Sequence, residues 1–139
     1  MATSLAAIRD ALETRLATVS GLHVYDVWPD QLDPPAAVIR PTIVDAEQCA
    51  GSSGIVLYVF EMHIFTSLAP GLPAAQDALD ALITARGTGS IEAALLGDTT
   101  LGGIGRLIPL PWRGYSSVKI PENGPEYLRA IKDCEVWAA

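Results

Sequence analysis

The feature that most restricts the fold of this chain is a run from Ile55 to Thr66 with two largely apolar sides. In an extended strand, one side carries Val56, Tyr58, Phe60, Met62 and Ile64, and the other carries Ile55, Leu57, Val59, Glu61, His63 and Phe65. Such a strand lies in the centre of a sheet, or it has helices on one face and another subunit on the other. The run therefore predicts a buried strand around which the rest of the chain packs.

Three segments are typical of helices. Apolar residues recur at three- and four-residue steps from Leu5 to Val19, and Gly21 follows as a stop. A second helix is predicted from Pro73 to Arg86, with acidic residues near its start. A short third helix runs from Ser90, which can cap it, to Leu96.

The remaining elements are strands. They are predicted at Leu22–Trp28, at Ala36–Val44, at Leu101–Trp112 and at Glu126–Trp137. Pro41 places the Ala36–Val44 strand at or near a sheet edge, because proline is tolerated there or at a bulge. The connections are the proline loop Pro29–Pro35, the segment Arg113–Ser117 and the turn Pro121–Pro125.

The resulting order is α-β-β-β-α-α-β-β. Strands that follow one another without crossover helices form a mainly antiparallel sheet, so the fold class is α+β. We expect four or five strands with two main helices packed on one face. Residues 1–139 are expected to form one domain, because half of the chain would have too few strands to bury a core.

Composition limits the function. With 9 Lys and Arg against 16 Asp and Glu, the chain has a formal charge of -7, which disfavours surfaces that grip nucleic-acid phosphates or anionic membranes. A chain of 139 residues buries roughly two thirds of its surface on folding, so it needs neither disulfides nor a structural metal to form a core. We see no signal peptide and no apolar run of membrane-spanning length. We therefore expect a soluble protein made in the cytoplasm.

The residues offer no catalytic constellation. There is no Gly-x-Ser-x-Gly motif, and His23 and His63 are the only possible imidazole bases. A zinc site could draw on His23, Cys49, His63 and Cys134, but their spacing matches no ligand pattern. We therefore predict that the chain is not an enzyme and that it has no catalytic residue, cofactor or metal.

Several residues are instead candidates for contacts with partner proteins. Glu61 and His63 share a strand face, where they could form an ion pair across subunits, bind a metal, or simply mark where the strand leaves the core. The polar segment Asp45–Gly54 contributes Glu47, Gln48, Ser52 and Ser53. Near a strand end lie Trp112, Arg113 and Tyr115, which have the composition of an interface anchor, although Trp112 could equally pack in the core.

Most of the chain resembles the tail terminator, or tail completion, proteins of long-tailed, siphovirus-type bacteriophages. The resemblance lies in the size, the order of elements and four local features. These are the opening helix Leu5–Val19 running into Gly21–Tyr25, the proline loop Pro29–Pro35 leading into Ala36–Pro41, the strand Tyr58–Phe65, and the closing strand Tyr127–Val136.

The resemblance implies a structural virion protein that catalyses no reaction. It would assemble in the host cytoplasm as a six-membered ring of identical copies at the tail-neck junction of the virion. There it would end polymerisation of the major tail tube protein and join the tail to the head connector or head-closure protein. Double-stranded DNA would pass through its lumen without specific binding, and no membrane would be involved. The alternatives are another neck, head-closure or minor tail protein, a dimeric host protein with the same layout, and a small-ligand-binding α+β domain.

Overall fold

The structure is a computed structural model that describes residues 5–25, 29, 31–45, 56–84, 90–103, 105–119 and 124–138. Its elements follow the predicted order α-β-β-β-α-α-β-β, with one additional short 3-10 turn. They are α1 (Leu5–Leu16), β1 (His23–Tyr25), β2 (Ala36–Asp45), β3 (Val56–Ser67), α2 (Leu72–Ile83), α3 (Ile91–Leu96), η1 (Leu101–Gly103), β4 (Gly105–Lys119) and β5 (Glu126–Ala138).

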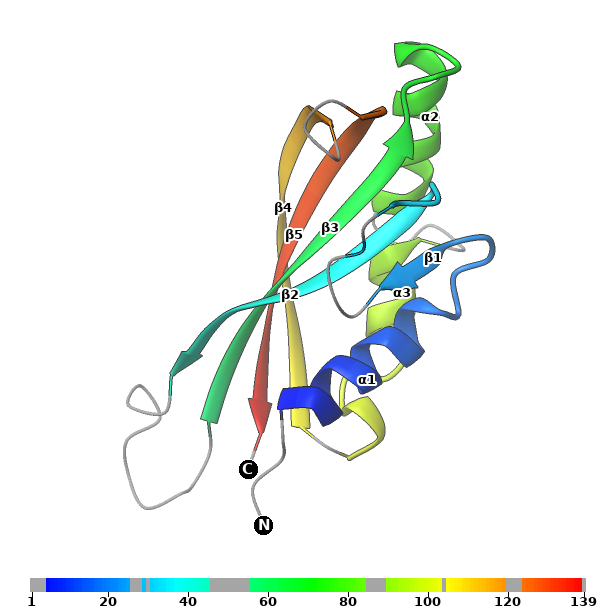
Figure 1. The fold of residues 1–139 in the computed structure, drawn as a ribbon. Helices are drawn as coiled ribbons and strands as arrows, with labels where there is room; N and C mark the ends of the chain where they lie inside the picture. The colour runs from blue at the N-terminus through cyan, green and yellow to red at the C-terminus, as the bar shows by residue number, and fades with distance from the viewer. Residues whose placement is uncertain are drawn as a thin grey trace.

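The strands form one five-stranded sheet in the order β1-β2-β3-β5-β4. Only the β1–β2 pair is parallel, and the other pairs are antiparallel, so the predicted α+β class is confirmed. Figure 1 shows α1, α2 and α3 on the same side of this sheet. The strand predicted to be buried, β3, lies in the centre between β2 and β5.

The core lies between the sheet and the helices. On β3 the core-facing residues include Phe60, Met62 and Ile64, each with no exposed surface. Ile8 and Leu12 of α1 are equally buried against this face. Because side chains alternate along a strand, the residues between them, including Glu61 and His63, point to the opposite face.

Some element ends differ from the predictions. The first helix ends at Leu16 and not at Val19, because the amides of Thr18 and Val19 bond to carbonyls only three residues back. The second helix ends at Ile83, and Thr84 is extended. The third helix begins as predicted, with the amide of Ala93 donating to the Ser90 hydroxyl (3.1 Å).

The largest correction concerns β4. The strand predicted to begin at Leu101 begins at Gly105, because Gly102 and Gly103 have positive φ and close the turn η1. At its other end β4 continues to Lys119, so Arg113–Ser117 belongs to the strand and is not a connection. Register shifts interrupt the pairing of β4 with β5 between Pro109 and Tyr115, and they keep this proline-bearing segment in the sheet.

No helix among the described residues is long and apolar enough to cross a membrane.

Candidate subunit interface on the helix-free sheet face

The sheet face opposite the helices, called here the helix-free face, is only partly covered. At one end Leu32 packs with Val38, Phe65 and Tyr127 in a second, smaller cluster. Beyond this cluster, no described helix covers the face (Figure 1). Of the side chains that lie there, Arg106 and Ile108 of β4 are exposed, while Val59 of β3 and Ile131 of β5 are half-buried.

Four charged or polar side chains from three strands form an ionic network in the middle of this face: Glu61, His63, Arg113 and Asp133. His63 donates from Nε2 to Glu61 Oε1 (3.1 Å), and the other carboxylate oxygen of Glu61 accepts from Arg113 Nη2. Arg113 also reaches Asp133, with 3.0 Å between Nε and Oδ2. These side-chain contacts link β3, β4 and β5.

The sheet register explains why these residues meet. Glu61 lies directly opposite Asp133 of β5, so two carboxylates face each other across neighbouring strands. Like charges at this spacing repel. Arg113 comes from β4, one strand further, just after the irregular pairing around Trp112, and its guanidinium lies between the two carboxylates. This arrangement replaces repulsion by a shared cation.

Burial and hydrogen bonding shift the pKa values of Glu61 and His63. Burial raises the pKa of Glu61, but hydrogen bonds from His63 and Arg113 outweigh it, so the pKa lies below its usual value. Burial lowers the pKa of His63, which is 4% exposed, and the attraction of Glu61 only partly opposes this. Arg129 and Arg40 lower it further. At neutral pH the network therefore holds a neutral histidine beside an ionised glutamate.

Apolar side chains flank the network. Val59, Ile131 and Trp137 are half-buried on the same face, and Ile108 of β4 is 37% exposed. A surface on which the charges are already paired and the apolar groups are half-buried loses little solvation when another protein covers it. The arrangement therefore suits contact with a partner better than it suits chemistry.

The structure brings together three of the residues predicted from the sequence, Glu61, His63 and Arg113. Trp112 points to the opposite face, where its ring lies 5.1 Å from Nζ of the buried Lys132, so it packs at the edge of the core. The side chain of Tyr115 lies outside the described structure, and so do Glu47, Gln48, Ser52 and Ser53.

Two charged residues were missed by the sequence reasoning. Asp133 completes the network, and strand alternation could have placed it on one face with Ile131 and Glu135. Lys132 is 1% exposed on the helix side and donates from Nζ to the carbonyl of Leu110 (2.6 Å). Burial lowers the pKa of Lys132. No pattern in the sequence marks this lysine as buried.

The residues considered for zinc lie apart. His23, the first residue of β1, pairs with Asp33 of the following loop (3.3 Å), while His63 lies on the helix-free face. Cys134 is buried on the helix side, and Cys49 is outside the described structure. Within the described ranges, no group of three His, Cys, Asp or Glu side chains could hold a metal ion.

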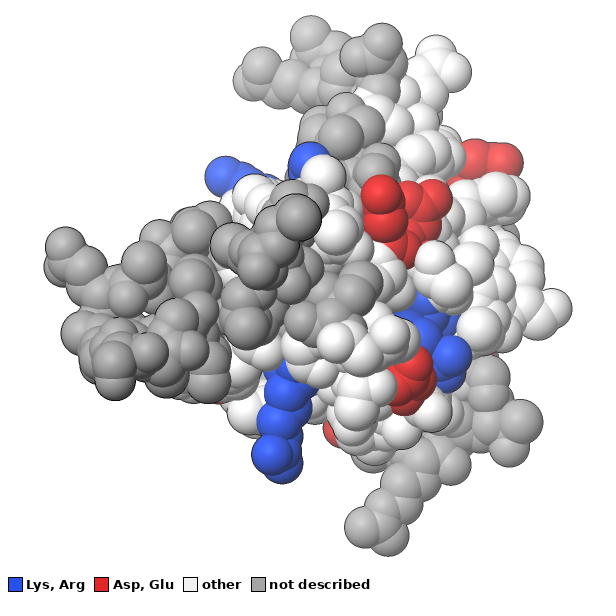
Figure 2. All heavy atoms as spheres, turned by 90° about the horizontal axis from the view of Figure 1, so that it is seen from below, with Lys and Arg blue, Asp and Glu red and all other residues white. Residues whose placement is uncertain are grey.

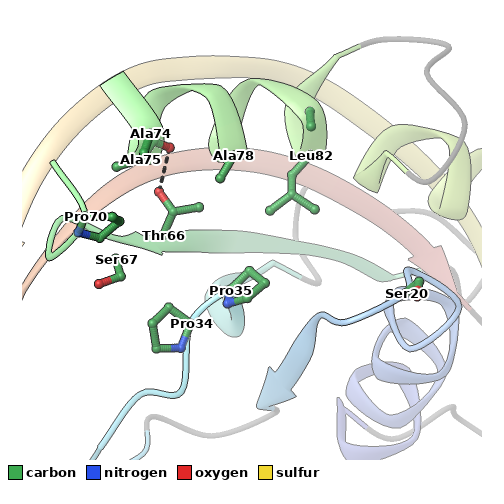
Figure 3. A pocket seen from close by; sticks show the side chains of 11 residues that line it. Ser20, Pro34, Pro35, Thr66, Ser67, Pro70, Ala74, Ala75, Ala78 and Leu82 are labelled. Carbon is green, nitrogen blue, oxygen red and sulfur yellow. Dashed lines mark hydrogen bonds between the residues drawn. The ribbon is translucent and has the colours of Figure 1, made fainter. Parts of the chain in front are cut away.

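The helix layer contains a groove of about 410 Å³. Figure 3 shows Ala74, Ala78 and Leu82 of α2 on one side of it and the loop residues Pro34 and Pro35 on the other. The Thr66 hydroxyl at its base donates to the carbonyl of Ala75 (3.0 Å). The lining is therefore mostly apolar, and this polar group is already bonded.

The surface charges are mixed. Figure 2 shows the end of the molecule that points down in Figure 1, where acidic and basic side chains are interspersed with uncharged surface. Over the described atoms of this end there is no continuous basic area of the kind that phosphate binding requires.

Comparison of the chain with models of known protein families found no match. Comparison with curated protein sequences also returned no match.

Proposed function

We propose that the chain is a structural protein of a bacteriophage tail, a tail terminator. Copies of it form a ring, six-membered as in the family it resembles, at the head-proximal end of the tail tube. The ring ends polymerisation of the tube protein and offers its free side to the head connector. DNA passes through the lumen without specific binding.

The observation that carries this proposal is the helix-free face. A two-layer α+β domain buries one face of its sheet under helices, and here the other face holds an ordered ionic network between half-buried apolar residues. Paired charges surrounded by apolar side chains are a composition that protein interfaces use. The structure also has the order of elements on which the resemblance to tail terminators rests.

A ring requires contacts of one kind repeated around an axis. Such contacts are heterologous, because a patch on one copy meets a different patch on the next.

A passage for DNA should also hold phosphates weakly. The net charge of -7 and the pairing of Arg113 with two carboxylates are compatible with this requirement.

Native mass spectrometry of a surface variant tests the proposal. Ile131→Glu places a charge among the half-buried apolar residues of the helix-free face and should abolish rings that the wild-type protein forms. Asp10→Asn, on the exposed side of α1, is the matched control and should leave ring formation unchanged. Circular dichroism checks that both variants are folded. Rings that persist in Ile131→Glu would contradict the use of this face.

A second candidate function is binding of a small molecule, and the groove beside α2 is the observation that favours it. Ligand sites combine an apolar lining with a few convergent polar groups. Here Thr66 is committed to α2 and the Ser67 hydroxyl accepts from the amide of Ala69 (3.2 Å). A screen of small apolar ligands by thermal shift tests this candidate, since a ligand of the folded state raises the melting temperature.

A further inference from the structure

The groove beside α2 has a chemical character that selects its occupant. Its lining consists mainly of alanine and proline, including Ala74, Ala78 and Ala81 of α2 and Pro34 and Pro35 of the facing loop. The only charged residues of α2 are Asp77 and Asp80, and Asp77 is exposed, adjoining the alanines of the groove on the helix surface. The groove therefore accepts an apolar side chain and favours a cation beside it.

One surface of the same molecule has the complementary character. Ile108, on the helix-free side of β4, is 37% exposed, more than any other large apolar side chain of the described sheet. Arg106, two residues earlier on the same face, is exposed and supplies the cation of this surface. Arg113, further along the strand, is already paired with Glu61 and Asp133. No acidic residue occurs in β4 itself, and Glu135 of β5 lies opposite Ile108.

The prolines of β4 decide how this segment makes contact. β4 is an edge strand, and such strands tend to pair with a strand of another chain. Pro109 and Pro111 have no amide hydrogen to donate, so they oppose the addition of a strand at this part of the edge. Contact here is therefore made by side chains and not by an extended sheet.

Ile108 cannot reach the groove of its own chain. The groove lies at Thr66, which pairs with Leu128 of β5 and through it with Ser117 of β4. Ile108 lies opposite Glu135, which is seven residues from Leu128 along β5, roughly 23 Å at about 3.3 Å per residue. The two surfaces can meet only between different copies.

We propose that the partner of the groove is a second copy of this chain, whose Ile108 enters the groove while its Arg106 lies beside Asp77. This inference rests on the proposed ring and names the two surfaces that repeat around it. The two patches are different, so the contact is heterologous and each copy uses both. The sheet side of one copy thus meets the helix layer of the next.

Cysteine cross-linking between two differently labelled populations tests the contact. Ile108→Cys and Ala78→Cys are made separately in a Cys49→Ser background, where the remaining Cys134 is buried. The two proteins are mixed and oxidised. We expect disulfide-linked pairs in the mixture at least tenfold above either protein alone. Ser117→Cys, exposed on β4 but far from Ile108, is mixed with Ala78→Cys as the matched control and should stay at background.

The outcomes separate this inference from the proposed function. If the wild-type protein forms rings and the mixture gives no cross-link above the control, the contact is wrong and the ring proposal stands. If the mixture cross-links but native mass spectrometry shows no closed ring, the contact is right and the ring proposal fails. Absence of both rings and cross-links overturns both.

Charge reversal provides a second readout that does not depend on oxidation. Arg106→Glu alone should weaken self-association at least tenfold, and so should Asp77→Lys alone. Both changes in one chain should restore association, because the pair is then re-formed with opposite signs. A double variant no better than the single variants would overturn the pairing of Arg106 with Asp77.

Discussion

Replacing Glu61 by glutamine removes the charge on which the ionic network depends and leaves the shape of the side chain unchanged. In the wild-type protein Glu61 accepts from both His63 and Arg113. Glutamine can still accept one of these bonds, but as a neutral group. The variant therefore isolates the contribution of the charge from that of packing.

The expected cost follows from the two contacts. A hydrogen bond to a charged group contributes about 1 kcal/mol more than a neutral one, which applies to the bond from the buried His63. The Arg113 pair contributes at most about 0.5 kcal/mol, because the Arg113 side chain is 48% exposed and solvent screens it. The free energy of unfolding at pH 7 should fall by about 1.5 kcal/mol, or roughly 5 °C in melting temperature for a chain of this size.

The variant should also change the pH dependence of stability. The pKa values of Glu61 and His63 in the folded protein both lie below those in the unfolded chain. Each group therefore contributes stability that is fully present above its unfolded-state pKa and is lost as the pH falls through its folded-state pKa. Wild-type stability should therefore decline below about pH 6.5 through His63 and again below about pH 4.3 through Glu61. In Glu61→Gln the part of the stability loss below about pH 4.3 that comes from protonation of Glu61 should be absent.

Urea unfolding from pH 3 to pH 8, combined with NMR titration of His63, measures these effects. Removing Glu61 takes away the attraction that raises the pKa of His63 and leaves burial, Arg129 and Arg40, which lower it. The pKa of His63 should thus fall further in the variant. Glu135→Gln, on the same face but outside the network, is the control. An unchanged or raised His63 pKa would show that Glu61 does not attract the protonated imidazole.

Three further predictions concern the core and the helices. Phe60→Ala should cost about 3–5 kcal/mol in urea unfolding, since Phe60 has no exposed surface, and a loss below 1 kcal/mol would contradict its central place. Ser90→Ala removes the cap of α3 and should cost about 1 kcal/mol, against no loss of stability for Thr14→Ala on the exposed side of α1, where alanine is the better helix former. Burial raises the pKa of Cys134 to about 12, so in Cys49→Ser protein a thiol reagent should modify it only upon unfolding, and rapid labelling of the native state would be inconsistent with its burial.

The sequence was sufficient to predict the order and type of the elements, because their hydrophobic periods are local properties. Alternation along Ile55–Thr66 also placed Glu61 and His63 together on one face, as the structure shows. Helix ends were less accurate, since the last turn of α1 tightens in a way that periodicity does not encode.

The rest of the network could not be predicted, because it depends on contacts between distant parts of the chain. Asp133 lies opposite Glu61 because β3 pairs with β5 and not with β4. The order of strands in a sheet is not a local property of the sequence. Arg113 reaches both carboxylates because β4 is irregular around Trp112 and extends beyond it, where the sequence indicated a connection.

The proposal that this chain caps a tail tube is tested by growing tubes from the tail tube protein in its presence and measuring their length by electron microscopy. We expect that tubes stop lengthening and have a ring at one end, and that Ile131→Glu protein leaves growth unaffected. Tubes that grow equally with and without the wild-type protein, with no density added at either end, would contradict it.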